Sequence, residues 1–191
     1  LPETLDLTRS TFADLTLTPH EVTGQLVTDG VETTIHAGLI RHPTEGKLFC
    51  HFEQATIGAV EFLTEDSIEE NPRQLDLSWV RFIDTTFSDF DFTSYRQCLE
   101  PNWQLHQWTT EEATEEFEHT PLETELTYMR AKSGSKEIGD NRAAGQFFKQ
   151  EMRARGARHK QDLADNPLRA GYRYIGNQLF RLSSNYAESP Q

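Results

Sequence analysis

The sequence predicts a β-solenoid followed by a smaller helical region. The first observation is a five-residue period of apolar side chains that stays in phase through three stretches of the first hundred residues. The second is a change of pattern after Trp103, where helix-capping motifs and helical spacing replace that period. Because a five-residue period fits neither an α-helix nor a regular strand, we expect a coil that turns once every five residues.

The apolar residues that carry the period are expected to face inward and to form the core of stacked coils. Four five-residue units would close one square coil of about twenty residues. The alternative is a β-sandwich, but strands with a period of two would not hold a five-residue phase. Val22 and Val27 share the phase. The predicted repeat core comprises Leu7, Phe12, Leu17, Phe52, Ile57, Phe62, Leu77, Phe82, Phe87 and Phe92.

The stretches LDLTR-STFAD-LTLTP, CHFEQ-ATIGA-VEFLT and LDLSW-VRFID-TTFSD-FDFTS resemble the pentapeptide-repeat family. The resemblance covers residues 5–29, 50–64 and 75–97 and implies a short right-handed quadrilateral β-helix. We therefore expect a pentapeptide-repeat β-helix over residues 1–100, with loops at 30–49 and 65–74. A helical region over residues 101–191, basic from residue 141, is expected to follow.

Helix signals dominate the second half of the chain. An acidic first turn after Thr110 predicts one helix. Thr120 and Glu123 fit a capping box, and Gly134 is expected to end the helix that it starts. Another helix is expected from Asp140–Asn141 to Gly156. The faces expected to pack inward are Leu122, Leu126 and Met129 in the helix after Thr120, Ala144, Phe147, Phe148 and Met152 in the next, and Leu168, Tyr172, Ile175, Leu179 and Leu182 in a last helix after Asn166–Pro167.

Charge is distributed unevenly along the chain, whose formal net charge is −13. Residues 1–140 carry 9 Lys/Arg and 27 Asp/Glu, a net of −18, whereas residues 141–191 carry 9 and 4, a net of +5. An acidic surface with few lysines indicates a halophilic protein. The basic segment is either a solvated helix face, a juxtamembrane segment or an RNA-binding patch. The residues expected to contact an anionic surface are Arg153, Arg155, Arg158, Lys160, Arg169 and Arg173.

The stretches GDNRAAGQFFKQEMRARGARHK and NPLRAGYRYIGNQLFRLSSNYAESP are similar to the linker of haloarchaeal pentapeptide-repeat proteins with a C-terminal ion-channel-like domain. In that group an NYGESP-like sequence leads into membrane helices; here Ala187 stands where Gly is common. The resemblance covers about residues 121–190 and implies an archaeal membrane protein whose channel part is absent here. Since the chain starts at Leu1 rather than Met, we expect it to be a piece of a longer protein.

No catalytic constellation, phosphate-binding loop or signal peptide is recognisable in the sequence. The seven histidines are scattered, and His42, Cys50 and His51 lack the spacing and fourth ligand of a zinc site. Cys50 is expected to be a buried thiol, not bonded to Cys98. We therefore predict no enzyme activity, no cofactor and no metal site. The tryptophans, expected to cover the edge of a core, are Trp79, Trp103 and Trp108.

Two classes of function are compatible with these features. The first is a non-catalytic cytoplasmic domain of an ion-channel-like membrane protein, acting in regulation or assembly. Its partners would be the membrane-embedded part of its own chain or an anionic membrane surface, and it could form a homo-oligomer. The alternative is a soluble acidic β-helix that binds a protein as a DNA mimic, or RNA or ribosomes through its basic helices. A run of about twenty apolar residues after Gln191 would favour the first class.

Overall fold

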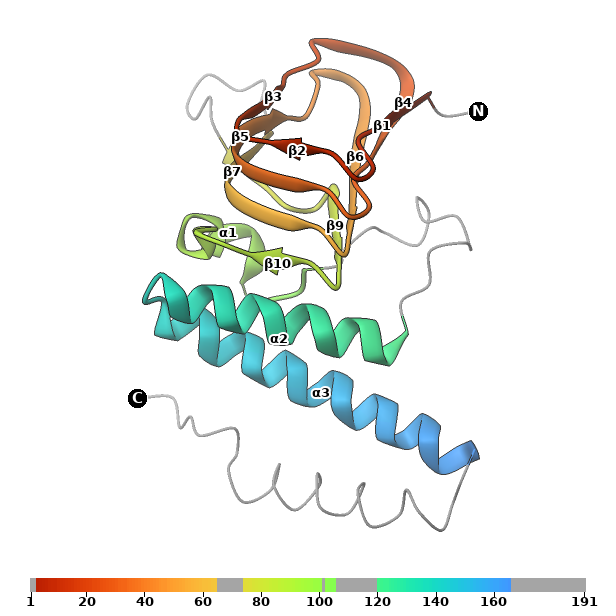
Figure 1. Cartoon of the computed structure of the whole chain (residues 1–191), viewed down its shortest axis with the longest axis vertical. Coiled ribbons are helices and arrows are strands. Elements are labelled where there is room, and N and C mark those ends of the chain that lie inside the picture. Colours follow the sequence, from red (N-terminus) through yellow and green to blue (C-terminus); the bar gives the residue numbers. More distant parts are fainter. Residues whose placement is uncertain (1–2, 65–73, 101, 106–119, 166–191) are drawn as a thin grey trace.

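The computed structural model of the chain describes residues 3–64, 74–100, 102–105 and 120–165. Strands fill the N-terminal half, and two long helices lie side by side across one end of them (Figure 1). The strands are β1 (Glu3–Asp6), β2 (Thr11–Phe12), β3 (Leu15–Leu17), β4 (Glu21–Asp29), β5 (Thr34–Arg41), β6 (Glu45–Glu53), β7 (Thr56–Thr64), β8 (Gln74–Leu75), β9 (Val80–Ile83) and β10 (Thr86–Phe87). The helices are the 3₁₀ turn η1 (Phe92–Tyr95), α1 (Arg96–Leu99), α2 (Pro121–Glu137) and α3 (Asn141–Asp165).

The strands form two sheets, both mainly parallel. One sheet has four strands in the order β1–β4–β6–β9. The other has six: β10–β7–β5–β2 is its main path, β3 also pairs with β5, and β8 pairs antiparallel with β7. The chain alternates between the two sheets, so two neighbouring strands of one sheet are separated in sequence by a segment that passes through the other sheet. Leu26 pairs with Leu48 and Thr34 with Thr56, 22 residues apart in both cases.

A column of left-handed corners marks where the chain leaves the four-stranded sheet. Arg9, Glu32, Gln54 and Asp84 follow β1, β4, β6 and β9 and have φ of 58°, 54°, 52° and 46°. Non-glycine residues adopt this backbone region uncommonly. The N–H groups of the first three donate to carbonyl groups of the next layer at 2.8–2.9 Å. Backbone pairing between layers therefore holds the corners in place.

The predicted fold class, a right-handed quadrilateral β-helix followed by a small helical region, is wrong. A square coil needs a turn after each five-residue unit, but β4, β6 and β7 each run for nine residues. The structure instead has two mainly parallel sheets with helices packed on them, a mixed α/β fold. The physical reason for this difference is the long run of paired residues between β5 and β7. Additional turns would interrupt this pairing and leave backbone N–H and C=O groups without hydrogen-bond partners.

The loop predicted at 30–49 is also wrong, because this range holds β5 and the first part of β6. Ile35 and Ile40 lie five residues apart and are fully buried, but in a different phase from the predicted repeat. A pattern followed in a single phase therefore missed them. The other predicted loop, 65–74, lies outside the described residues except for Gln74, where β8 begins.

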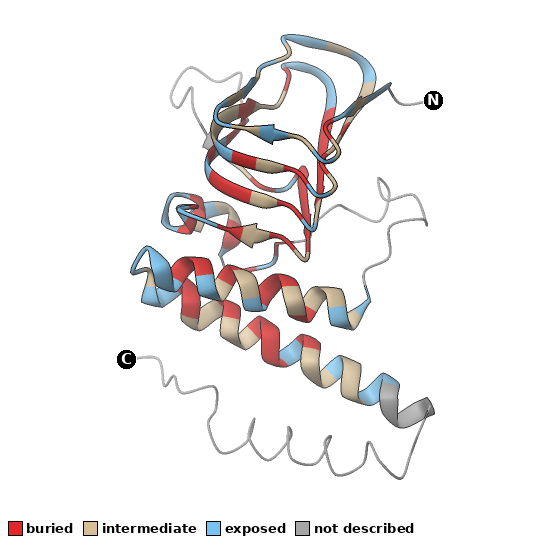
Figure 2. Ribbon diagram, viewed as in Figure 1, coloured by how far each residue is buried: buried red, intermediate tan, exposed pale blue. Residues whose placement is uncertain are grey.

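One hydrophobic core joins the sheets to the helices. Phe52, Phe62 and Phe82 are fully buried, and the centroids of their rings lie 6.0–6.1 Å apart. Phe12 and Leu17 of the predicted repeat core are half-buried, and its other eight members are buried. Burial decreases from the strands next to α2 toward β1, β2 and β3 (Figure 2). The core is therefore most complete on the side that carries the helices.

The predicted capping box at the start of α2 is confirmed. Thr120 Oγ1 accepts the N–H of Glu123 at 3.2 Å, and the Glu123 carboxylate accepts the N–H of Thr120 at 2.8 Å. The predicted end at Gly134 is wrong, because this glycine lies inside α2 against β10. A Cβ there would be 2.5 Å from the carbonyl oxygen of Phe87, so close packing requires glycine. Gly156, predicted to end α3, also lies inside its helix.

The apolar stripe predicted to face inward on α2 faces away from the sheets. Leu122 and Met129 are 45% and 38% exposed, and Leu126 is half-buried. Thr127 and Ala131 are fully buried instead. Their short side chains let the helix approach the strands closely, which the larger leucines would prevent. The predicted inner face of α3 is buried at Ala144, Phe147 and Met152 and half-buried at Phe148.

Candidate functional site

α2 lies across the last strands of both sheets and supplies partners to their polar groups. The N–H of Asp84 donates to Thr127 Oγ1 at 2.8 Å. The guanidinium of Arg130 donates to Thr86 Oγ1 at 2.6 Å and pairs with the Asp84 carboxylate at 2.7 Å. α2 thus covers the sheet edge formed by β9 and β10. Without the helix, a further strand could pair with this edge. These contacts fix the helices relative to the sheets.

Aromatic rings continue the core of the sheets into α3. The ring centroid of Phe92 lies 4.9 Å from that of Phe87 in β10 and 4.7 Å from that of Phe147 in α3. Phe147 is fully buried and also contacts Trp103 at 5.5 Å and Tyr128 at 6.2 Å. Because these rings are in direct contact, a shift of α3 at Phe147 must displace Phe92 and, through it, Phe87 of β10.

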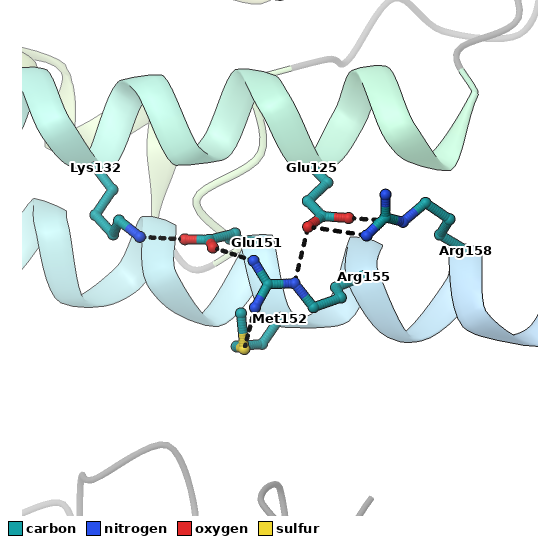
Figure 3. A network of polar contacts seen from close by, with 6 residues as sticks. All are labelled: Glu125, Lys132, Glu151, Met152, Arg155 and Arg158. Atoms are coloured by element: carbon teal, nitrogen blue, oxygen red, sulfur yellow. Dashed lines mark hydrogen bonds and ion pairs between the residues drawn. The ribbon is translucent and has the colours of Figure 1, made fainter. Parts of the chain in front are cut away.

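Two buried carboxylates hold α2 and α3 together (Figure 3). Glu125 of α2 pairs with Arg155 at 2.8 Å and with Arg158 at 3.1 Å. Glu151 of α3 pairs with Arg155 at 2.8 Å and with Lys132 of α2 at 2.5 Å. We call these five residues the α2–α3 network. The side chains of the two glutamates are only 9% and 4% exposed, so removing a cationic partner would leave a buried charge poorly compensated.

The residues predicted to contact an anionic surface divide into three groups. Arg155 and Arg158 belong to the α2–α3 network and direct their guanidinium groups at glutamates of this chain. Arg153 and Lys160 are exposed on α3. Two of the six predicted positions therefore have a structural role, and two keep their charges at the surface. Outside the described residues lie Arg169 and Arg173.

Sequence reasoning missed the acidic half of the α2–α3 network. Glu151 stands four residues before Arg155, a spacing that places both on one helix face and could have indicated the pair. Glu125 is 30 residues from Arg155, and no local spacing signals their contact. Only the antiparallel packing of α2 against α3 brings them together.

An open hollow of about 420 Å³ lies beside the start of α3, lined in part by Asp89, Asp91 and Asp140. Burial acts to raise the pKa of Asp140, but hydrogen bonds from the Ala143 N–H at 3.0 Å and the Thr93 hydroxyl at 2.7 Å outweigh it, so the pKa is lowered. The ionised carboxylate caps α3. Asp140 therefore has a structural role and is poorly suited to proton transfer.

Cys50 and His42 have structural roles. Burial raises the pKa of the Cys50 thiol to about 12, which makes a reactive thiolate unfavourable. His42 Nε2 accepts the N–H of Leu48 at 3.3 Å, so this ring ties the chain between β5 and β6. No group of three or more His, Cys, Asp or Glu in the described ranges could hold a metal ion. Trp79 and Trp103 are buried, Cys50 and Cys98 are free thiols, and Trp108 lies outside the described residues.

No protein-family model, curated protein or solved structure matches the chain. In the part of the chain that the structure describes, no helix combines the length and the apolar character needed to cross a bilayer. The candidate site is therefore interpreted from its own geometry: a helical layer, fixed to the sheets, with exposed basic residues on α3.

Proposed function

We propose that the chain is a non-catalytic assembly or regulatory module of an ion-channel-like membrane protein, placed at the cytoplasmic face of the membrane. The observation that carries the proposal is the packing of α3 on the rest of the core through Phe147. α3 leads into the C-terminal segment whose sequence is similar to a linker that precedes membrane helices. A membrane-embedded part would thus be connected to a helix that is fixed to the sheets.

α3 has the length and the attachments of a rigid connecting rod. Its 25 residues span about 37 Å at 1.5 Å per residue. Phe147 attaches its first half to the aromatic core, whereas Glu151 near its middle and Arg155 and Arg158 in its second half attach it to α2. Because α3 is attached at two separate points, rotation of the helix about either point is opposed by the other attachment. Displacement of its C-terminal end would therefore be passed to the sheets.

Electrostatic attraction to lipid is a minor part of the proposed role. Among the described residues predicted to contact an anionic surface, Arg153 and Lys160 are exposed, and each could contribute about 1 kcal/mol near an anionic leaflet. Molar salt screens such attraction strongly. A covalently connected membrane span is therefore needed to hold the module, while the basic residues help to keep it on the cytoplasmic side.

Fractionation of the native full-length protein in molar salt tests the proposal. We expect recovery in the membrane pellet, and the same recovery for a variant with Arg153→Gln and Lys160→Gln, because a span rather than charge retains the protein. Recovery wholly in the soluble fraction would refute the proposal. Sedimentation with ribosomes would also refute it and would favour RNA binding by the basic residues.

A further inference from the structure

The two ends of the sheets differ in what covers them. α2 covers β9 and β10 at one end. At the other end, within the described residues, β1 pairs only with β4, and β2 and β3 pair only with β5. Each of these edge strands therefore presents one row of backbone groups without a strand partner in that part of the chain. Such a row is a template for an added strand.

Apolar side chains at this open end are incompletely buried. Phe12, Leu15 and Leu17 pack against the hydrophobic core from one side but remain half-buried. Figure 2 shows this region in the colours of intermediate and exposed residues, in contrast to the buried residues beside α2. A further layer of chain above β2 and β3 would remove this apolar surface from water, which favours binding.

The open end is surrounded by exposed carboxylates. The basic groups at this end already have acidic partners: Arg9 pairs with Glu32 at 2.7 Å, and His20, when protonated, pairs with Glu21 at 3.6 Å. The local charge is therefore negative and complementary to lysine or arginine side chains. The exposed acidic residues of β1, of the β2–β3 turn and of the start of β4 are Glu3, Asp6, Asp14 and Glu21.

We infer that this open end binds an extended, basic segment of a partner protein by strand addition. The backbone of the segment pairs with β1 or with β2 and β3. Its alternate apolar side chains cover Phe12, Leu15 and Leu17, and its lysine and arginine side chains lie among the surrounding carboxylates. The inference rests on the assembly role proposed above and specifies the kind of partner.

Pairing with a second copy of the chain is disfavoured by the sequence of β1. A two-fold antiparallel pairing of Glu3–Asp6 with itself would place Glu3 directly opposite Asp6 of the other copy. Like charges in directly opposite positions destabilise a strand pair. A basic heterologous strand avoids this repulsion, which is why we assign the surface to such a partner.

The test uses the full chain and a fluorescent peptide of about eight residues in which lysine and valine alternate. One control peptide carries N-methyl groups on alternate backbone nitrogens, which removes the hydrogen bonds of one edge. The charge-reversed protein variant combines Asp14→Lys and Glu21→Lys. Its matched control is Glu137→Lys, an exposed acid at the end of α2, far from the open end. Binding is measured by anisotropy, and backbone protection by hydrogen exchange.

We expect slower exchange of amides in residues 3–17 when the peptide is bound. The N-methylated peptide and the doubly charge-reversed protein should each bind about tenfold more weakly, and Glu137→Lys less than about twofold. Equal binding of the N-methylated peptide, an equal effect of Glu137→Lys, protection elsewhere, or no binding would overturn the inference. So would self-association that the double variant abolishes, because a second copy would then occupy the edge. Recovery of the native protein in the soluble fraction would refute the membrane role while leaving the peptide result intact.

Discussion

Replacing Phe147 with alanine tests whether α3 is fixed to the rest of the core. The side chain is fully buried, and its ring centroid lies 4.7–6.2 Å from those of Phe92, Trp103 and Tyr128. Loss of its transfer free energy and creation of a cavity should cost about 3–5 kcal/mol. The higher helix propensity of alanine offsets about 0.5 kcal/mol. The expected decrease in the free energy of unfolding is therefore about 2.5–4.5 kcal/mol.

Phe148→Ala is the matched control, because it makes the same change at the next position of the same helix. Phe148 is half-buried, and its ring centroid lies 5.4 Å from Nζ of Lys132, so we expect a cost of about 1 kcal/mol. Urea unfolding in molar KCl gives both free energies, provided that the denaturant slope is unchanged. Equal shifts of the two midpoints would refute the attachment of α3 through Phe147.

Three further predictions follow from described contacts. Gly134→Ala should cost about 1–3 kcal/mol, measured by thermal unfolding, because the added methyl group would lie 2.5 Å from the Phe87 carbonyl oxygen; an unchanged melting temperature would show that α2 can move. Burial lowers the pKa of His51, so the unfolded chain binds a proton more readily, and stability should decrease as pH falls from 6.5 through the folded-state pKa. His51→Gln should flatten that slope in denaturation curves between about pH 5 and pH 8. Arg155→Ala should lower the free energy of unfolding by about 2–3 kcal/mol, because it leaves buried carboxylates of the α2–α3 network less compensated. The control Arg153→Ala should cost less than about 0.5 kcal/mol. Similar unfolding midpoints for the two variants would contradict the structural role of Arg155.

The five-residue spacing located buried side chains but did not determine the fold. Phe82, Phe87 and Phe92 are spaced by five and all are buried. The residues between core positions can turn or stay extended, and pairing with a neighbouring strand decides which. β7 stays extended for nine residues because β5 pairs along it, a contact between residues about 22 apart that no local pattern specifies.

The candidate site was predicted only where its signals are local. The capping box at Thr120 involves residues three apart, and the sequence identified it. The buried face of α2 depends instead on how closely the helix approaches β10, which favours Ala131 and Gly134 over the larger Leu122. Likewise, the basic residues of α3 are visible in the sequence, but their division between buried ion pairs and the surface depends on Glu125 of a different helix.

The four left-handed corners repeat the same backbone strain in successive layers. Arg9, Glu32, Gln54 and Asp84 differ in size and charge but share a φ of 46–58°, so the layer spacing rather than the local side chain dictates this positive φ. A residue better suited to that conformation, such as asparagine in place of Gln54, should recover up to about 1 kcal/mol. Because the geometry recurs, a substitution that increases stability at one corner should also increase it at the others. Substitutions at these corners could therefore raise the free energy of unfolding. The added stability could compensate for destabilising substitutions by which a new binding surface evolves or is engineered.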